Sequence, residues 1–221
     1  MTDEDKIYLK WPTPIGVFDN KEHKLIKPDL IKFFEDYKSK NLSSRKATEN
    51  LKLYESNYDI QKLGNPFFTK LMKFFANSIA KITTSANQEI INKIKSETNN
   101  NKPLDYNIII EEAWFIIYEK GGFVRPHIHG STWSLVYYVQ IPESKNQDVN
   151  EGDTYFLSPI VPRHRNDFAS EYNKFQILDI KAKEGNLVIW PSHLVHGSMP
   201  ININKKRIIV SANASVNLKK E

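Results

Sequence analysis

The chain has 221 residues, of which 40% are hydrophobic and 12% aromatic, so it can bury a core and does not have the composition of a disordered protein. The sequence contains no cysteine, which excludes disulfide bonds and thiolate metal sites. The formal net charge is +5, but the lysines are scattered, and the basic stripe with interleaved aromatics that is typical of nucleic-acid binders is missing.

The sequence also lacks a membrane signal. It has no run of about eighteen apolar residues, the minimum for a membrane-spanning helix. The opening MTDEDKIYLKW is charged and lacks the apolar stretch of a signal peptide. We therefore expect a cytoplasmic protein without a membrane partner.

The first part of the chain, residues 1–103, is predicted to be an extended lead-in followed by helices. Pro12 and Pro14 disfavour a helix near the start. Residues 27–41 place apolar side chains at helical spacing, and residues 66–97 do so over a longer stretch that fits one helix or two. The polar cluster TNNNKP, residues 98–103, ends this pattern.

From residue 104 the pattern changes to short segments rich in β-branched and aromatic residues, each bounded by Gly, Pro, Asn or Asp. These predicted strands are residues 106–118, 133–141, 154–158, 175–182, 186–190 and 207–216. Many short strands at this spacing predict a mostly β fold of the jelly-roll type over residues 104–217. The helices of the first part would pack outside it, and residues 218–221 would form a tail.

Three of the six histidines are spaced to share a metal ion. His127 and His129 are two residues apart, so on an extended chain both side chains point to one side. His196 follows the predicted strand 186–190, and a jelly roll can bring a late strand end beside an early one. Two neighbouring ligands and one distant ligand form a facial set that leaves metal positions open for substrates. The H-x-H pair alone would fit two loop histidines bonded to backbone or solvent. His193 is expected at the pocket edge or on the surface and not as a ligand.

The last predicted strand carries polar residues on one face. Arg207, Ile209, Ser211 and Asn213 alternate with apolar residues, so these four side chains share a face. Such a face must look at water or into a polar pocket. Arginine is suited to bind a carboxylate through two parallel hydrogen bonds. The alternative for Arg207 is a surface cation in a lysine-rich turn.

Several ordered motifs resemble one enzyme family over roughly residues 106–216. GGFVRPHIHGSTWSLVYYVQIPE, EGDTYFLSP, EGNLVIWPSHLVHGSMP and KRIIVSAN are similar to segments of an H-x-H…H…R group of 2-oxoglutarate–Fe(II) dioxygenases. The resemblance implies a double-stranded β-helix, which is a cupin-like jelly roll, with Fe(II) held by His127, His129 and His196. It implies hydroxylation of a substrate that it does not name, with O2 and 2-oxoglutarate consumed and succinate and CO2 released.

The resemblance also implies roles in binding the cosubstrate. Arg207 would hold the distal carboxylate of 2-oxoglutarate, with Ser211 and Asn213 on the same face, and Tyr118 and Tyr138 would hydrogen-bond the cosubstrate. Plain packing is the alternative for Tyr138.

The sequence departs from the better-known oxygenases at one ligand. His129 stands where those enzymes carry Asp or Glu, so the metal would have one negative charge fewer. The alternative reading is a three-His cupin-type metal-binding protein, or a dioxygenase that does not use 2-oxoglutarate. The spacings from Gly121 to His127 and from Gly185 to His196 fit that class, but the glutamate it expects shortly after His129 is absent. The position of Arg207 discriminates, because only the first reading needs it in the pocket.

Overall fold

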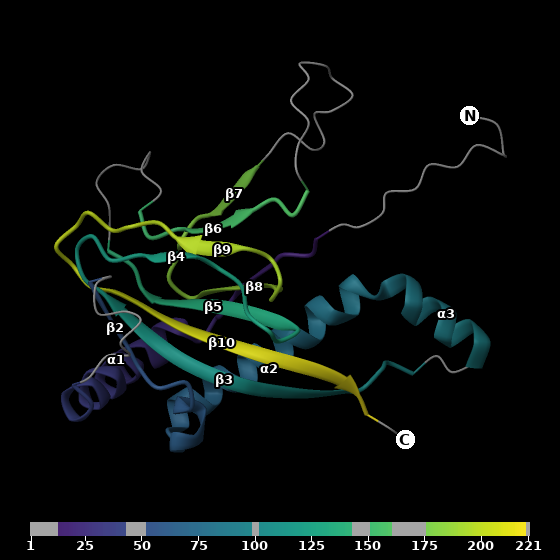
Figure 1. Ribbon diagram of the computed structural model, residues 1–221. Helices are drawn as coiled ribbons and strands as arrows, with labels where there is room; N and C mark the ends of the chain where they lie inside the picture. The colour runs from purple at the N-terminus through teal and green to yellow at the C-terminus, as the bar shows by residue number, and fades with distance from the viewer. Residues whose placement is uncertain (1–12, 43–51, 99–101, 143–150, 161–175, 220–221) are drawn as a thin grey trace, which may run out of the picture.

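The computed structural model describes residues 13–42, 52–98, 102–142, 151–160 and 176–219. Two β-sheets lie one above the other, and helices cover the outer side of the larger sheet (Figure 1). The larger sheet has the strand order β1 (Gly16–Asp19), β8 (Asn186–Pro191), β5 (Trp133–Gln140), β10 (Arg207–Leu218), β3 (Tyr106–Tyr118) and β2 (Leu53–Glu55). The smaller sheet has the order β4 (Val124–His127), β9 (His196–Ser198), β6 (Thr154–Leu157) and β7 (Ile177–Ile180). This arrangement confirms the predicted mostly β jelly roll with a helical layer.

The two long strands β3 and β10 lie side by side in the larger sheet. They pair antiparallel from Arg207 opposite Tyr118 to Leu218 opposite Tyr106, with a register shift between Asn213 and Ala214. Strand β5 pairs with the other edge of β10. Because side chains alternate along a strand, each of these strands presents one row to the helices and one row to the smaller sheet.

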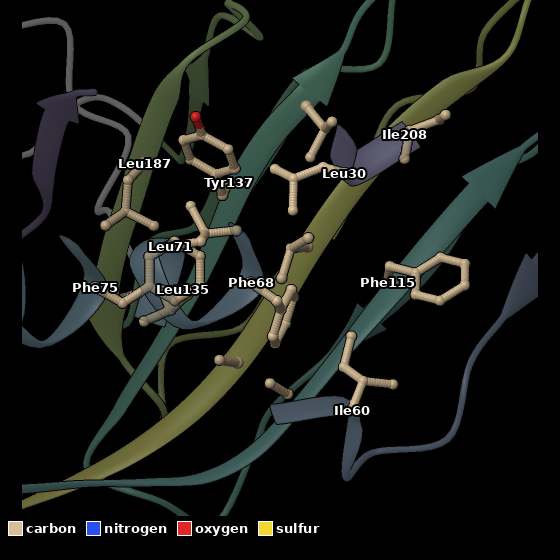
Figure 2. Packing of buried hydrophobic residues seen from close by; sticks show 14 of the residues in the cluster. Leu30, Ile60, Phe68, Leu71, Phe75, Phe115, Leu135, Tyr137, Leu187 and Ile208 are labelled. Atoms are coloured by element: carbon tan, nitrogen blue, oxygen red, sulfur yellow. The ribbon is translucent and has the colours of Figure 1, made fainter. Parts of the chain in front are cut away.

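The outer row packs against the helices α1 (His23–Lys40) and α2 (Pro66–Ala86). Figure 2 shows Leu30 of α1 and Phe68, Leu71 and Phe75 of α2 over this face. The ring of Phe34 stacks on Phe115 of β3 with a centroid distance of 4.3 Å. Burying side chains of this size contributes about 1.5–3 kcal/mol each, so this layer is the main hydrophobic core.

The inner row faces the smaller sheet and forms a second core. It contains Trp114, Ile116, Val136 and Ile209. Ile208, Val210 and Ala212 belong instead to the outer core, so the alternation predicted for residues 207–213 is confirmed.

The helices differ from the sequence prediction at their bounds. Helix α1 begins at His23, before the predicted residue 27, because the Asn20 side chain accepts a hydrogen bond from the backbone of Glu22 and opens the first turn. The apolar stretch after Pro66 forms two helices, α2 and α3 (Gln88–Thr98), which meet at Asn87. The side chain of Asn65 caps the start of α2 by accepting from two backbone N–H groups.

Two segments of the first hundred residues join the larger sheet as its edge strands β1 and β2, and a short 3-10 helix, η2 (Ile60–Leu63), follows β2. Pro12, residues 99–101 of the predicted border, residue 175 and residues 220–221 of the predicted tail lie outside the described residues. Within the described ranges, no helix combines the length and apolar character needed to span a membrane.

Candidate metal centre

The smaller sheet brings the three predicted histidines together. His127 on β4 and His196 on β9 are direct register partners, and β4 pairs antiparallel with β9. His129 lies just after β4, where its backbone N–H donates to the carbonyl of Ser192 at 2.9 Å. One possible ligand nitrogen from each ring lies within 4.8 Å of the others. Among the described residues, these three histidines form the group of His, Cys, Asp or Glu side chains that lie close enough together to hold one metal ion.

Backbone carbonyls orient two of the three rings. Nδ1 of His127 lies 2.8 Å from the carbonyl oxygen of Arg125, and Nδ1 of His196 lies 2.9 Å from that of Leu194. A carbonyl can only accept, so Nδ1 carries the proton and Nε2 keeps its lone pair for a metal. The indole N–H of Trp190 also approaches Nδ1 of His196 at 3.2 Å. Nδ1 cannot donate to the carbonyl and accept from the indole at once, and the Leu194 contact is the shorter of the two, so we place the proton on Nδ1.

The rings of His129 and His196 are neutral at physiological pH. Burial, and then the charge of His127, lower the pKa of His129 to about 4. The same two causes, in the same order, lower the pKa of His196 to about 3. A neutral imidazole is the form that binds metals, so neither of these two rings has to lose a positive charge before it takes an ion.

The three histidines and Arg207 line one cavity of about 450 Å³. Arg207 is 1% exposed, and none of its three guanidinium nitrogens has a hydrogen-bond partner among the described residues. Burial raises the pKa of nearby Asp153, and the charge of Arg207 opposes that shift. Asp153 accepts a hydrogen bond from the backbone of Ala182 and makes none to Arg207. A buried guanidinium without a partner is costly, so this cavity is suited to an anion.

The remaining predicted residues fall into two groups. Tyr118, Ser211 and Asn213 line the same cavity. Tyr138 is fully buried and does not line it; its hydroxyl is hydrogen-bonded at 2.7 Å to Thr154, which does. His193 is exposed and lies outside the cavity lining.

Sequence reasoning missed the polar residues that surround His129. Ser134 and Ser192 are buried and hydrogen-bonded to one another, and Glu112 contacts Asn213. A signal for Glu112 was present, because it alternates with Trp114, Ile116 and Tyr118 on the inner face of β3. Ser192 carried no such signal, since it follows the end of β8.

A comparison with known families gives one match. Residues 112–213 match the family described as "Putative 2OG-Fe(II) oxygenase". No curated protein is significantly similar to the sequence.

The fold is also found in solved structures, among them the following three. A Pseudomonas putida prolyl-4-hydroxylase is 12% identical, with a TM-score of 0.55 over 91% of this chain and 92% of that one. HygX from Streptomyces hygroscopicus, with nickel, 2-oxoglutarate and hygromycin B bound, is 10% identical, with a TM-score of 0.56 over 91% of this chain and 82% of that one. The α-ketoglutarate-dependent epimerase SnoN from nogalamycin biosynthesis is 10% identical, with a TM-score of 0.59 over 94% of this chain and 82% of that one. These likenesses establish the double-stranded β-helix fold. The three histidines and Arg207 all lie within residues 112–213, the part of the chain that matches the family described as "Putative 2OG-Fe(II) oxygenase".

Proposed function

We propose that this protein is a 2-oxoglutarate- and Fe(II)-dependent dioxygenase that uses O2 to hydroxylate a second substrate and releases succinate and CO2. The observation that carries the proposal is the buried guanidinium of Arg207, which has no hydrogen-bond partner among the described residues and lines the same cavity as the three histidines. The cavity thus combines nitrogen ligands for a metal with a cation for an anionic ligand.

The histidines fit Fe(II). Imidazole nitrogen is a suitable ligand for iron, and three ligands leave positions open for a cosubstrate and oxygen. His127, His129 and His196 would hold the ion, and no thiolate or carboxylate joins them among the described residues. When bound, iron and 2-oxoglutarate supply the oxidising chemistry, while the protein supplies binding and orientation.

Arg207 fits the distal carboxylate of 2-oxoglutarate. Its guanidinium can form two parallel charge-assisted hydrogen bonds with a carboxylate. The Tyr118 ring lies 4.4 Å from the guanidinium carbon and restricts its orientation. Ile116, Val136 and Ile209 line the cavity with apolar surface, which excludes water and strengthens the interaction between the two charges.

One feature favours a second candidate. His129 is neutral, whereas the better-known oxygenases that the sequence resembles carry a carboxylate at this ligand. A three-His centre that binds metal without 2-oxoglutarate would share the histidine geometry but would have no use for Arg207.

The test is an anaerobic titration of the Fe(II)-loaded protein with 2-oxoglutarate, followed by visible absorption. We expect a metal-to-ligand charge-transfer band in the wild type. Arg207→Met should bind Fe(II) as the wild type does and require at least ~30-fold more 2-oxoglutarate, the effect of removing one partner of a buried charge pair.

Arg125→Met is the matched control, because Arg125 lies at the same cavity but is exposed. It should keep the wild-type affinity for 2-oxoglutarate. Fe(II) binding without the band, together with an unchanged Arg207→Met variant, would replace this proposal by the three-His alternative.

A further inference from the structure

A row of polar side chains crosses the inner face of the larger sheet beside His129. Glu112 on β3, Asn213 on β10 and Ser134 on β5 are direct register partners across the three strands. The Ser134 hydroxyl donates to Oδ1 of Asn213 at 2.8 Å, and Nδ2 of Asn213 donates to Oε2 of Glu112 at 3.1 Å. Asn213 is 2% exposed, so these two bonds replace water at its amide.

This row fixes which way the Asn213 amide points. The Glu112 oxygen accepts in this bond, so the amide nitrogen has to face it. Reversing the amide would bring Oδ1 against the carboxylate, and two acceptors would then meet without a proton between them. Ser134 gives its single proton to Oδ1, so the Ser192 hydroxyl, 2.8 Å away, donates to Ser134.

The amide orientation determines the tautomer of His129. Nδ2 of Asn213 lies 3.4 Å from Nδ1 of His129. An amide nitrogen donates and does not accept, so Nδ1 of the neutral ring is the acceptor and the ring proton is on Nε2. His127 and His196 face backbone carbonyls and carry the proton on Nδ1. His129 therefore carries its proton on Nε2, whereas His127 and His196 keep Nε2 free for a metal.

We propose that Glu112 and Asn213 are positioning residues that hold His129 in the tautomer that cannot bind through Nε2. Ligation by all three histidines then requires the Asn213 amide to turn and offer Oδ1 to Nδ1–H of His129. Nε2 loses one proton and Nδ1 gains one, so the ring stays neutral. The turned Nδ2 can donate to the Ser134 hydroxyl, but the bond to Glu112 is lost, and this bond opposes the turn. The inference rests on the proposed function only in taking the three histidines as the metal ligands.

The decisive variant is Glu112→Gln. The glutamine amide can donate to Oδ1 of Asn213 after the Asn213 amide has turned, so the turn no longer costs the hydrogen bond to residue 112. His129 should therefore shift toward the Nδ1–H tautomer. We expect Co(II), used as an air-stable probe, to bind about tenfold more tightly, the effect of one hydrogen bond no longer being lost on binding. Simple electrostatics predicts the reverse, because the substitution removes a negative charge near a cation.

Two measurements test this. Nitrogen-15 NMR of histidine-labelled, metal-free protein should report Nε2–H for His129 in the wild type and a shift toward Nδ1–H in Glu112→Gln. Competition with a chelator gives the Co(II) affinity. Glu111→Gln is the control, because it removes the same charge at the preceding residue, which is exposed. It should change neither the tautomer of His129 nor the Co(II) affinity.

Asn213→Leu provides a second route to the same answer. Leucine has a volume similar to that of asparagine but no amide donor. His129 should therefore no longer be held with its proton on Nε2. A wild type that binds Co(II) but shows Nδ1–H on His129, or a Glu112→Gln variant that binds Co(II) more weakly, would overturn the positioning role alone. A wild type that binds no Co(II) would overturn the proposed metal centre, and with it this inference.

Discussion

The guanidinium carbon of Arg207 lies 4.4 Å from the centre of the Tyr118 ring, and the two residues are direct register partners on β10 and β3. The Tyr138 ring lies 5.7 Å away from the same carbon. The faces of aromatic rings attract a cation but accept none of its directional hydrogen bonds. The contact therefore partly offsets the burial of the charge while leaving its donors unused.

The first prediction follows from these unused donors. Arg207→Met should make the ligand-free protein more stable, by about 1–3 kcal/mol, because it removes buried donors that have no partner among the described residues. Excess 2-oxoglutarate, at about 100 times its dissociation constant for the wild type, should stabilise the metal-loaded wild type by about 2.7 kcal/mol and the variant by less than about 1 kcal/mol. Urea denaturation with and without ligand measures both effects. A variant less stable than the wild type without ligand would mean that Arg207 has a protein partner.

The second prediction concerns the metal ligands. Alanine at His127, His129 or His196 should weaken Co(II) or Fe(II) binding by more than ~100-fold, because losing a direct ligand exceeds the usual effect of losing an outer partner. Isothermal titration under anaerobic conditions measures the affinity. His193→Ala is the control, because His193 is exposed and outside the cavity lining. Loss of metal from His193→Ala would require a different ligand set.

The third prediction is a pH dependence of the metal-free protein. The pKa values of His129 and His196, about 4 and about 3, lie below the ordinary histidine value of 6.5. Between these values the unfolded chain binds more protons than the folded one, so stability is complete above pH 6.5 and falls as the pH drops. Each histidine contributes at most about 1.4 kcal/mol per pH unit. Thermal unfolding between pH 7 and pH 4 in the presence of a chelator should show this slope.

The matched variants separate these histidines from the carboxylates that titrate in the same range. His129→Gln should unfold with a shallower dependence on pH, whereas His193→Gln should keep the wild-type slope. Equal slopes in all three proteins would contradict the assignment of a lowered pKa to His129.

The fourth prediction concerns Gly152, which packs against Arg207. Its φ is +73°, and a Cβ added there would lie 2.9 Å from Cδ and 3.0 Å from Nε of Arg207. Gly152→Ala should therefore cost about 1–2 kcal/mol of stability for the left-handed backbone and also displace Arg207, which weakens 2-oxoglutarate binding.

Gly64→Ala isolates the backbone contribution. Gly64 has a φ of +70°, and a Cβ added there would meet nothing within 4 Å. This variant should be destabilised by a similar amount and keep the affinity for 2-oxoglutarate. Equal affinities in the two variants would show that Arg207 does not depend on the close approach of Gly152.

The sequence by itself determined the features that depend on local geometry. Side chains alternate along a strand whatever the strand pairs with, so Arg207, Ser211 and Asn213 could be assigned to one face before any partner was known. The same two-residue period put His127 and His129 on one side of the chain. The helical spacing of Leu30, Ile31, Phe34 and Tyr37 marked α1, although its start at His23 depended on the Asn20 turn.

Only the tertiary structure decided which of these local faces meet. His127 and His196 become partners through the antiparallel pairing of β4 and β9, and Glu112 meets Asn213 and Ser134 through the registers of three strands far apart in the sequence. Register depends on the packing of the whole sheet, and a slip of one residue would turn every side chain to the other face. The burial of Arg207 and the tautomer of His129 follow from these registers, because each is set by the atoms that neighbouring strands bring to it.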